Sequence, residues 1–251
     1  MENLLNHFYN QVVKVMSNPQ VREVVPTLAH LHASFDTMEH AGAIYIGQVL
    51  GNKPHGLGFL VRSSQILFGG LFVKGVKTGF GIAFALNSPH YEGDFLGGVY
   101  HGHGTLYHAT SPIKIMYQGQ FINGKFYGEG WYYEPIFGRL LFKGEFQNNK
   151  YHKGTMYSYT SPYHGKIFKG VFKNNIITEG KMYDPHGNVI YKGPFNRSAQ
   201  AHGCGKEYTA SGMTYKGLFC NGKYHGAFKV KSSNGCVERV KFVHGQQCHD
   251  I

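Results

Sequence analysis

The sequence predicts an all-β protein, an elongated single-layer twisted sheet of tandem β-hairpins that form a repeat solenoid, with a short helical segment at the N-terminus. Three observations support this fold class. The 35 glycines among 251 residues are about twice the usual share. They occur with 18 Tyr and 19 Phe, whereas disordered glycine-rich chains contain few aromatic residues. A glycine–aromatic unit also recurs every 23–26 residues, which is typical of repeat architectures.

Each unit opens with an aromatic residue followed by any residue and a glycine. A phenylalanine stands four residues after the opening ring in every unit except the first, where Val49 takes this place. A second glycine pair follows, as in Gly102-x-Gly104. The eight opening rings, in chain order, are Tyr45, Phe68, Tyr91, Tyr117, Phe142, Phe168, Tyr191 and Tyr215.

This pattern resembles the MORN (membrane occupation and recognition nexus) repeat, whose unit reads roughly YxGxFxxGxxHGxGxxxY. The best copy runs from Tyr91 to Tyr107, and the resemblance extends from residue 45 to about residue 245. A degenerate ninth unit closes the chain, with Glu238, Val240 and Phe242 at the repeat positions. The resemblance implies a scaffold at the membrane periphery or in a cytoskeletal assembly. It also implies binding of phosphoinositides or phosphatidic acid, which is reported for some members.

The unit suits a hairpin because side chains alternate between the two faces of a strand. The opening aromatic, its glycine and the phenylalanine therefore share one face, and the bare glycine leaves room for a ring from the neighbouring strand. Asn-Gly pairs such as Asn123-Gly124 follow, and they tolerate the positive φ of tight hairpin turns. Because a single hairpin is marginally stable, stacked units should bury their apolar faces against one another. Such a sheet offers long grooves and no deep pocket.

The repeat domain is expected to cover residues 41–251, which leaves residues 1–40 as a helical cap or docking segment. Apolar residues from Leu4 to Met16 follow helical spacing, and a second helix is expected after Pro26 with a stripe that includes Phe35 and Met38. The segment either covers the open edge of the first hairpin, docks on a membrane or partner, or lies in the sheet's own groove. The sequence leaves these alternatives open.

The predicted function is a non-catalytic scaffold or adaptor. An aromatic-lined groove would hold an extended or helical segment of a partner protein, and a few rings would supply most of the binding energy. The sequence does not sort the rings into core and groove. The candidate groove rings are Tyr91, Phe95, Tyr117, Phe121, Trp131, Tyr133, Phe142 and Phe146.

Positive charge suggests an alternative ligand. The formal net charge is +11, and residues 126–251 carry 17 basic and eight acidic side chains, against eight and six in residues 1–125. One residue after the opening ring, the later units place lysines that face away from the aromatic row. These lysines either bind an anionic ligand, such as an acidic peptide or anionic phospholipid, or keep an exposed face soluble. They are Lys143, Lys169, Lys192 and Lys216.

Other chemistry is disfavoured. No nucleophile, phosphate-binding or metalloprotease motif is present, so neither an enzyme nor a cofactor is predicted. The cluster of Cys236, His244, Cys248 and His249 matches no zinc spacing. A row of turn histidines, including His55 and His101, is expected to stabilise turns by hydrogen bonds.

Partners and location follow from the same features. Nucleic acid is disfavoured because no recognition motif accompanies the charge. A homo-oligomer through the C-terminal sheet edge stays open. The absence of a signal peptide and of a membrane-spanning apolar run predicts a cytoplasmic protein at the cytoskeleton or membrane periphery.

Overall fold

The computed structural model describes residues 34–86, 88–109 and 112–248, and all nineteen regular elements in these residues are β-strands. Neighbouring strands pair antiparallel in the order of the chain. The chain divides into two compact units, Met1–Arg139 (unit 1) and Leu140–Ile251 (unit 2), which are described separately. Among the described residues there is no helix with the length and apolar character needed to cross a membrane.

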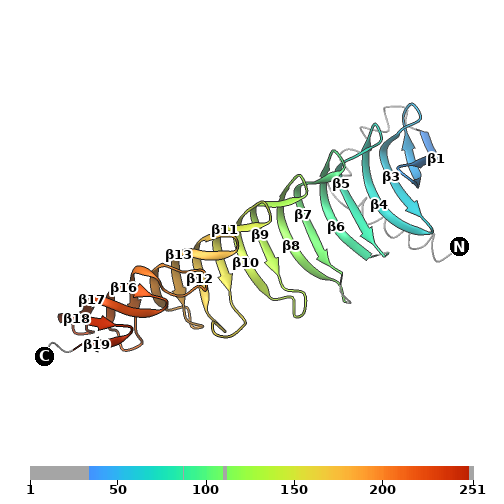
Figure 1. Cartoon of the computed structure of the whole chain (residues 1–251). Helices are drawn as coiled ribbons and strands as arrows, with labels where there is room; N and C mark the ends of the chain where they lie inside the picture. Colours follow the sequence, from blue (N-terminus) through green and yellow to red (C-terminus); the bar gives the residue numbers. More distant parts are fainter. Residues whose placement is uncertain (1–33, 87, 110–111, 249–251) are drawn as a thin grey trace. The chain divides into compact units, whose positions relative to one another are not determined.

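Unit 1 contains the first nine strands, which lie side by side in sequence order (Figure 1). Their bounds are β1 Ser34–His40, β2 Ala43–Val49, β3 Pro54–Arg62, β4 Gln65–Val73, β5 Val76–Ala85, β6 Ser88–Leu96, β7 Val99–His108, β8 Lys114–Ile122 and β9 Lys125–Tyr133.

Unit 2 repeats this arrangement with ten strands, most of them shorter than those of unit 1 (Figure 1). Their bounds are β10 Leu140–Gln147, β11 Lys150–Tyr157, β12 Ile167–Lys173, β13 Ile176–Tyr183, β14 Val189–Pro194, β15 Gly203–Tyr208, β16 Thr214–Cys220, β17 Lys223–Lys231, β18 Val237–Val243 and β19 Gln246–Cys248.

The predicted hairpins are confirmed. Each opening ring lies on the first strand of a hairpin, and the degenerate last unit forms the hairpin β18–β19 around its buried Phe242. The turns have the predicted left-handed conformation, with φ of 50° at Asn123 and 75° at Gly124. Two successive residues with positive φ match the right-handed twist of the strands, so each turn fixes the register of its hairpin.

A row of glycines crosses the strands of each unit, because the glycines of neighbouring strands stand directly opposite one another. The row explains the predicted alternation of rings and bare backbone. A Cβ added to Gly104 would lie 2.3 Å from the hydroxyl oxygen of Tyr91, whose ring rests on this part of the backbone. The row runs through Gly47, Gly58, Gly70, Gly81, Gly93, Gly104, Gly119 and Gly130 in unit 1, and through Gly144, Gly154, Gly170, Gly180 and Gly193 in unit 2.

The aromatic rings of the repeat form the core. Tyr91 makes edge-to-face contacts with Phe95 of its own strand, at 5.2 Å between ring centroids, and with Phe121 of the next repeat, at 5.1 Å. Its hydroxyl donates a hydrogen bond to the carbonyl of Asp94 at 2.9 Å. Each such pair adds about 0.5–1.5 kcal/mol beyond the burial of area. One ring therefore joins its own repeat to the next.

The prediction of a helix after Pro26 is wrong for residues 34–40. Ser34–His40 forms strand β1, and Met38 stands opposite Tyr45 of β2. The edge of β2 offers unpaired backbone groups, and pairing with them outweighs the helical spacing that includes Phe35 and Met38. The remaining helical prediction falls in residues 1–33, outside the described residues.

Candidate functional site

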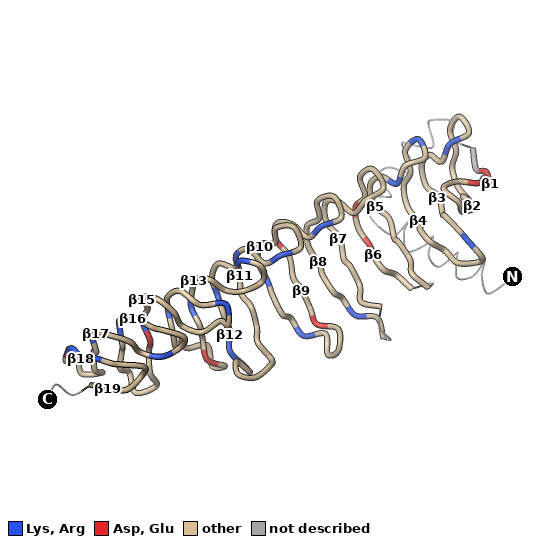
Figure 2. Tube along the Cα trace, viewed as in Figure 1, with Lys and Arg blue, Asp and Glu red and all other residues tan. Residues whose placement is uncertain are grey.

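The sheet face opposite the buried rings is hollowed in both units. In unit 1 a groove of about 910 Å³ lies over β5–β9, and in unit 2 a groove of about 1150 Å³ lies over β12–β18. The lining of the two grooves differs in charge, because lysine and arginine are concentrated in the strands of unit 2 (Figure 2).

Six of the eight candidate groove rings belong to the core instead. Their exposed fractions are 4% or less, because they occupy the repeated positions that pack against the glycine row and against one another. The prediction that they contact a partner is therefore wrong for Tyr91, Phe95, Tyr117, Phe121, Phe142 and Phe146.

The other two candidate rings, Trp131 and Tyr133, do line the groove of unit 1. Trp131 is 40% exposed and stands in a cross-strand row that includes Glu92, a threonine and a glutamine on the three preceding strands. Tyr107 adds a further aromatic side chain that the sequence did not single out, and Phe80 also lines the groove but is buried in a hydrophobic cluster. This groove therefore offers ring faces together with neutral and acidic groups.

Tyr107 is fixed by a contact inside this groove. Its hydroxyl donates a hydrogen bond to a carboxylate oxygen of Glu92 at 3.4 Å. Burial, reinforced by the charge of Glu92, raises the pKa of Tyr107 to about 12. The hydroxyl therefore stays protonated at neutral pH and holds the carboxylate.

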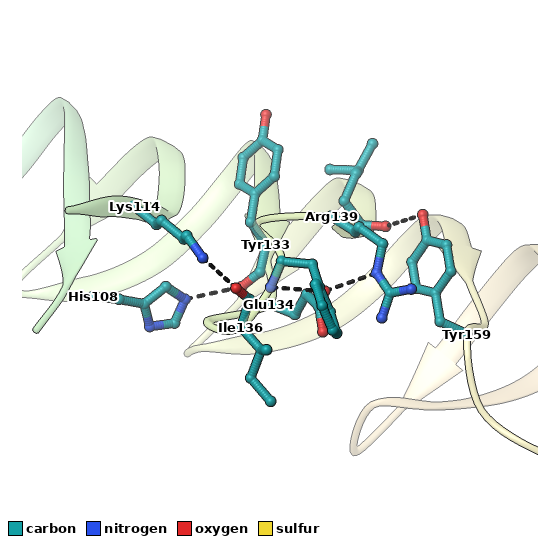
Figure 3. A network of polar contacts seen from close by, with 9 residues as sticks. His108, Lys114, Tyr133, Glu134, Ile136, Arg139 and Tyr159 are labelled. Atoms are coloured by element: carbon teal, nitrogen blue, oxygen red, sulfur yellow. Dashed lines mark hydrogen bonds and ion pairs between the residues drawn. The ribbon is translucent and has the colours of Figure 1, made fainter. Parts of the chain in front are cut away.

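The end of β9 is also held in place (Figure 3). The Nε2 of His108 donates to the carbonyl of Tyr133 at 3.1 Å, and the ammonium of Lys114 donates to the carbonyl of Ile136. In the loop that follows, the Arg139 guanidinium pairs with Glu134 at 2.7 Å, and this hydrogen bond lowers the pKa of the Glu134 carboxyl. The strand end that carries Tyr133 is thus fixed before any ligand arrives, which reduces the entropy lost on binding.

The groove of unit 2 is lined by cations that stand directly opposite one another. Seven of them occupy seven adjacent strands, β12 to β18, and all seven line the groove. This set, here named the cationic ladder, consists of Lys169, Lys181, Lys192, Lys206, Lys216, Lys229 and Arg239.

The four candidate lysines all lie on this row. Lys169, Lys192 and Lys216 belong to the ladder, and Lys143 continues its line beyond Thr155 of β11. All four are exposed. Their position after the opening ring predicts that they share one face of the sheet, and the register of the strands agrees with this prediction.

The cations of the return strands were not predicted from the repeat pattern. These cations alternate with the predicted lysines along the row, and the last one follows at its end. They are Lys181, Lys206, Lys229 and Arg239. The sequence did contain a signal for Lys181. Where two glycines stand opposite each other in antiparallel strands, the residues that flank them also stand opposite each other. Once Gly170 faces Gly180, Lys169 must face Lys181.

The ladder lacks internal neutralisation. Among the residues that line the groove, Glu179 is the one carboxylate. Within the part of the chain that the structure describes, no ion pair joins a ladder cation to an acidic side chain. Lys206 instead places its ammonium 4.7 Å from the centre of the Tyr208 ring. The groove therefore presents positive charge to solvent.

Two of the turn histidines make the predicted hydrogen bonds within or between turns, and two others do not. The Nδ1 of His55 accepts a hydrogen bond from the backbone amide of Lys74 in the next hairpin turn, at 3.5 Å. His202 accepts one from the amide of Asn221 in the same way, at 3.4 Å. The Nδ1 atoms of His101 and His225 are buried without such a bond. No group of three or more His, Cys, Asp or Glu side chains that could hold a metal ion occurs in the described residues.

Comparisons with known proteins agree with this architecture. The family model of the MORN repeat matches residues 45–65, 91–111 and 117–134, and each matched segment contains the turn that joins the two strands of one repeat in unit 1. A search of curated proteins finds no match to the chain. With the repeat motif, the hairpins and the glycine row in agreement, the chain contains MORN repeats.

Proposed function

We propose that this protein is a non-catalytic scaffold that holds a segment of a partner protein in the groove of its hairpin sheet. MORN repeats are generally protein- or membrane-binding motifs, and the family is typically non-catalytic. The supporting observation is the separation of two sets of residues. The repeated rings are buried in the core, whereas the grooves on the opposite face are lined, besides glycines of the row, by side chains that differ between the two units.

The aromatic side chains of unit 1 supply the anchors for this binding. Trp131, Tyr133 and Tyr107 line one groove, and Trp and Tyr are the residue types that most often dominate binding energy. An open groove beside a single sheet fits an extended or helical peptide better than a small molecule. A scaffold of this kind would act in a cytoskeletal or membrane-peripheral assembly.

Site-specific cross-linking tests this function. A photoreactive amino acid at Thr105, which lines the groove of unit 1, should cross-link to the partner in cells. Trp131→Ala combined with Tyr133→Ala should abolish the cross-link, while Phe137→Ala, an aromatic side chain exposed in the loop after β9, should preserve it. A partner that cross-links equally well to the double variant would disprove the proposal.

The exposed cations of unit 2 favour a second candidate, binding of anionic phospholipid headgroups such as phosphoinositides or phosphatidic acid. Such binding should appear as co-sedimentation with anionic vesicles, and it should decline as salt screens the charges. Lys169→Glu, Lys192→Glu and Lys216→Glu together should abolish it. If the triple variant still co-sediments, the phospholipid candidate is wrong.

A further inference from the structure

We propose that the groove of unit 2 binds an acidic α-helix of the partner protein, with one carboxylate per helical turn facing the cationic ladder. This inference rests on the proposed function and names the chemistry of its ligand. The observation that supports it is the register of the ladder cations, which stand opposite one another on seven adjacent strands and line one groove. They are Lys169, Lys181, Lys192, Lys206, Lys216, Lys229 and Arg239.

The register makes the ladder unfavourable in the free protein. Like charges directly opposite each other on neighbouring strands destabilise a sheet. The fold itself does not require charge at this position, since the corresponding row of unit 1 carries Thr105, Gln118 and Trp131. The seven cations destabilise the unbound sheet, and an anionic ligand would neutralise their repulsion. Binding of such a ligand therefore explains why they stand in this row.

The spacing of the charges selects a helix over an extended chain. Adjacent strands lie about 4.8 Å apart, so the ladder presents one cation at about that interval. A helix that carries Glu or Asp once per turn presents carboxylates about 5.4 Å apart. In an extended chain with acidic residues on one face, the carboxylates lie ~6.8 Å apart, so their spacing departs further from that of the ladder cations. The long lysine side chains can absorb the smaller mismatch.

The shape of the site separates this ligand from other polyanions. The cations line a groove, whereas a membrane presents a broad surface of headgroups. Single-stranded nucleic acid binds through rows of aromatic rings that stack on bases. The aromatic residues that line this groove are Tyr183 and Phe228, and Phe228 is buried. A slender acidic protein element suits these features best.

Two synthetic peptides of identical composition test the proposal against the purified full-length protein. Each has about 25 residues, enough for seven helical turns. One carries Glu at alternating three- and four-residue intervals, and the other has the same Glu residues scrambled around the helix. Binding measured by fluorescence anisotropy should favour the striped peptide at least tenfold and should weaken with added salt. Equal binding of the two peptides would overturn the inference.

Matched charge reversals locate the site. Lys181→Glu, Lys192→Glu and Lys206→Glu together should weaken binding of the striped peptide roughly 100-fold. The same three reversals at Lys150, Lys173 and Lys223, exposed near hairpin turns outside the ladder, change the net charge equally and should have little effect. Circular dichroism checks that both variants fold, and Lys→Gln at the three ladder positions gives an intermediate loss. Similar losses in the ladder and turn variants would contradict the inference.

Two further arms separate the outcomes. Ladder-dependent binding to phosphatidic acid vesicles without binding of the striped peptide would assign the ladder to membranes and overturn the inference. Phe137→Ala should leave peptide binding unchanged, because Phe137 is exposed in the loop after β9 and lines neither groove. If the native partner still cross-links at Thr105 while no acidic peptide binds, the scaffold function survives and the ladder inference alone fails.

Discussion

At the residue scale, the fold depends on the absence of one methyl group at each position of the glycine row. Gly104 lies under the ring of Tyr91, and the Cβ of an alanine there would lie 2.3–2.6 Å from three atoms of that side chain. The ring cannot move aside easily, because Phe95 and Phe121 contact its edges. A small residue at one position therefore fixes a large residue on the neighbouring strand.

Gly104→Ala should consequently destabilise the protein by about 1–3 kcal/mol, the usual cost of overpacking a core. The free energy of unfolding in urea measures this effect. Thr105→Ala, one residue further along β7 on the groove face, should change it by no more than about 0.5 kcal/mol. A Gly104→Ala variant as stable as Thr105→Ala would show that the ring is not held where the structure places it.

The tyrosine hydroxyls contribute separately from their rings. Tyr117 is fully buried and donates a hydrogen bond to the carbonyl of Gln120 at 3.0 Å. Tyr117→Phe keeps the ring contacts and removes the donor, so it should lower the free energy of unfolding by about 1 kcal/mol. Tyr132→Phe, on the opposing strand and only half-buried, serves as the comparison and should cost less.

At the scale of the strand, the cationic ladder sets charge repulsion against sheet formation. Each ladder cation faces at least one other across a neighbouring strand, and the unliganded strands bear that repulsion together. Thr155 occupies the same row between Lys143 and Lys169, so a neutral β-forming residue fits this position. Binding and stability should therefore respond in opposite directions to loss of charge.

Lys192→Thr with Lys206→Thr should raise the melting temperature of the unliganded protein at low salt. Relief of opposed like charges is worth about 0.2–1 kcal/mol per pair. Added salt should shrink the gain, because it screens the repulsion in the wild type. Lys173→Thr, whose residue faces Ile176 across the strand pair, provides the control and should not show this salt-dependent gain. A double variant that melts at or below the wild type in low salt would contradict the repulsion.

At the scale of the whole molecule, buried tyrosines give both units a common sensitivity to alkali. Burial raises the pKa of Tyr45, Tyr91 and Tyr117 in unit 1 and of Tyr224 in unit 2 well above the ordinary value. Burial also raises the pKa of Tyr191 to about 12. These groups bind their protons more tightly when folded. Their stabilising contribution is therefore complete below about pH 10 and declines as pH rises through the folded pKa.

The melting temperature should accordingly fall steeply between about pH 10 and pH 12, together with the appearance of phenolate absorbance. Tyr191→Phe removes one titrating hydroxyl and should make the fall shallower, although the variant loses the hydrogen bond to Pro194 at lower pH. Comparing the two pH profiles cancels the deprotonation of lysines, which both proteins share. Identical slopes in this range would contradict the assignment to tyrosine.

The sequence predicts the local parts of this molecule well and the pairing-dependent parts less well. Hairpins, turns and the ring-over-glycine contact follow from spacing within one repeat, as the Asn123-Gly124 turn and the Tyr91–Gly104 contact show. Alternation assigned rings and lysines to opposite faces but did not tell which face opens into a groove, so six core rings entered the candidate site. The ladder cations on return strands, such as Lys181, emerge only once the register between strands is known.

The glycine row also bears on how such a protein can change over evolutionary time. Since neighbouring repeats meet through equivalent rings, Tyr or Phe, and bare backbone, a duplicated hairpin brings both halves of the junction that it needs. Gene duplication could lengthen a groove by two strands, or about 10 Å, without redesigning any core. Substitutions at the flanking positions could then adapt the added length to a new ligand, and the seven-strand run of basic residues is the kind of local specialisation that such growth permits.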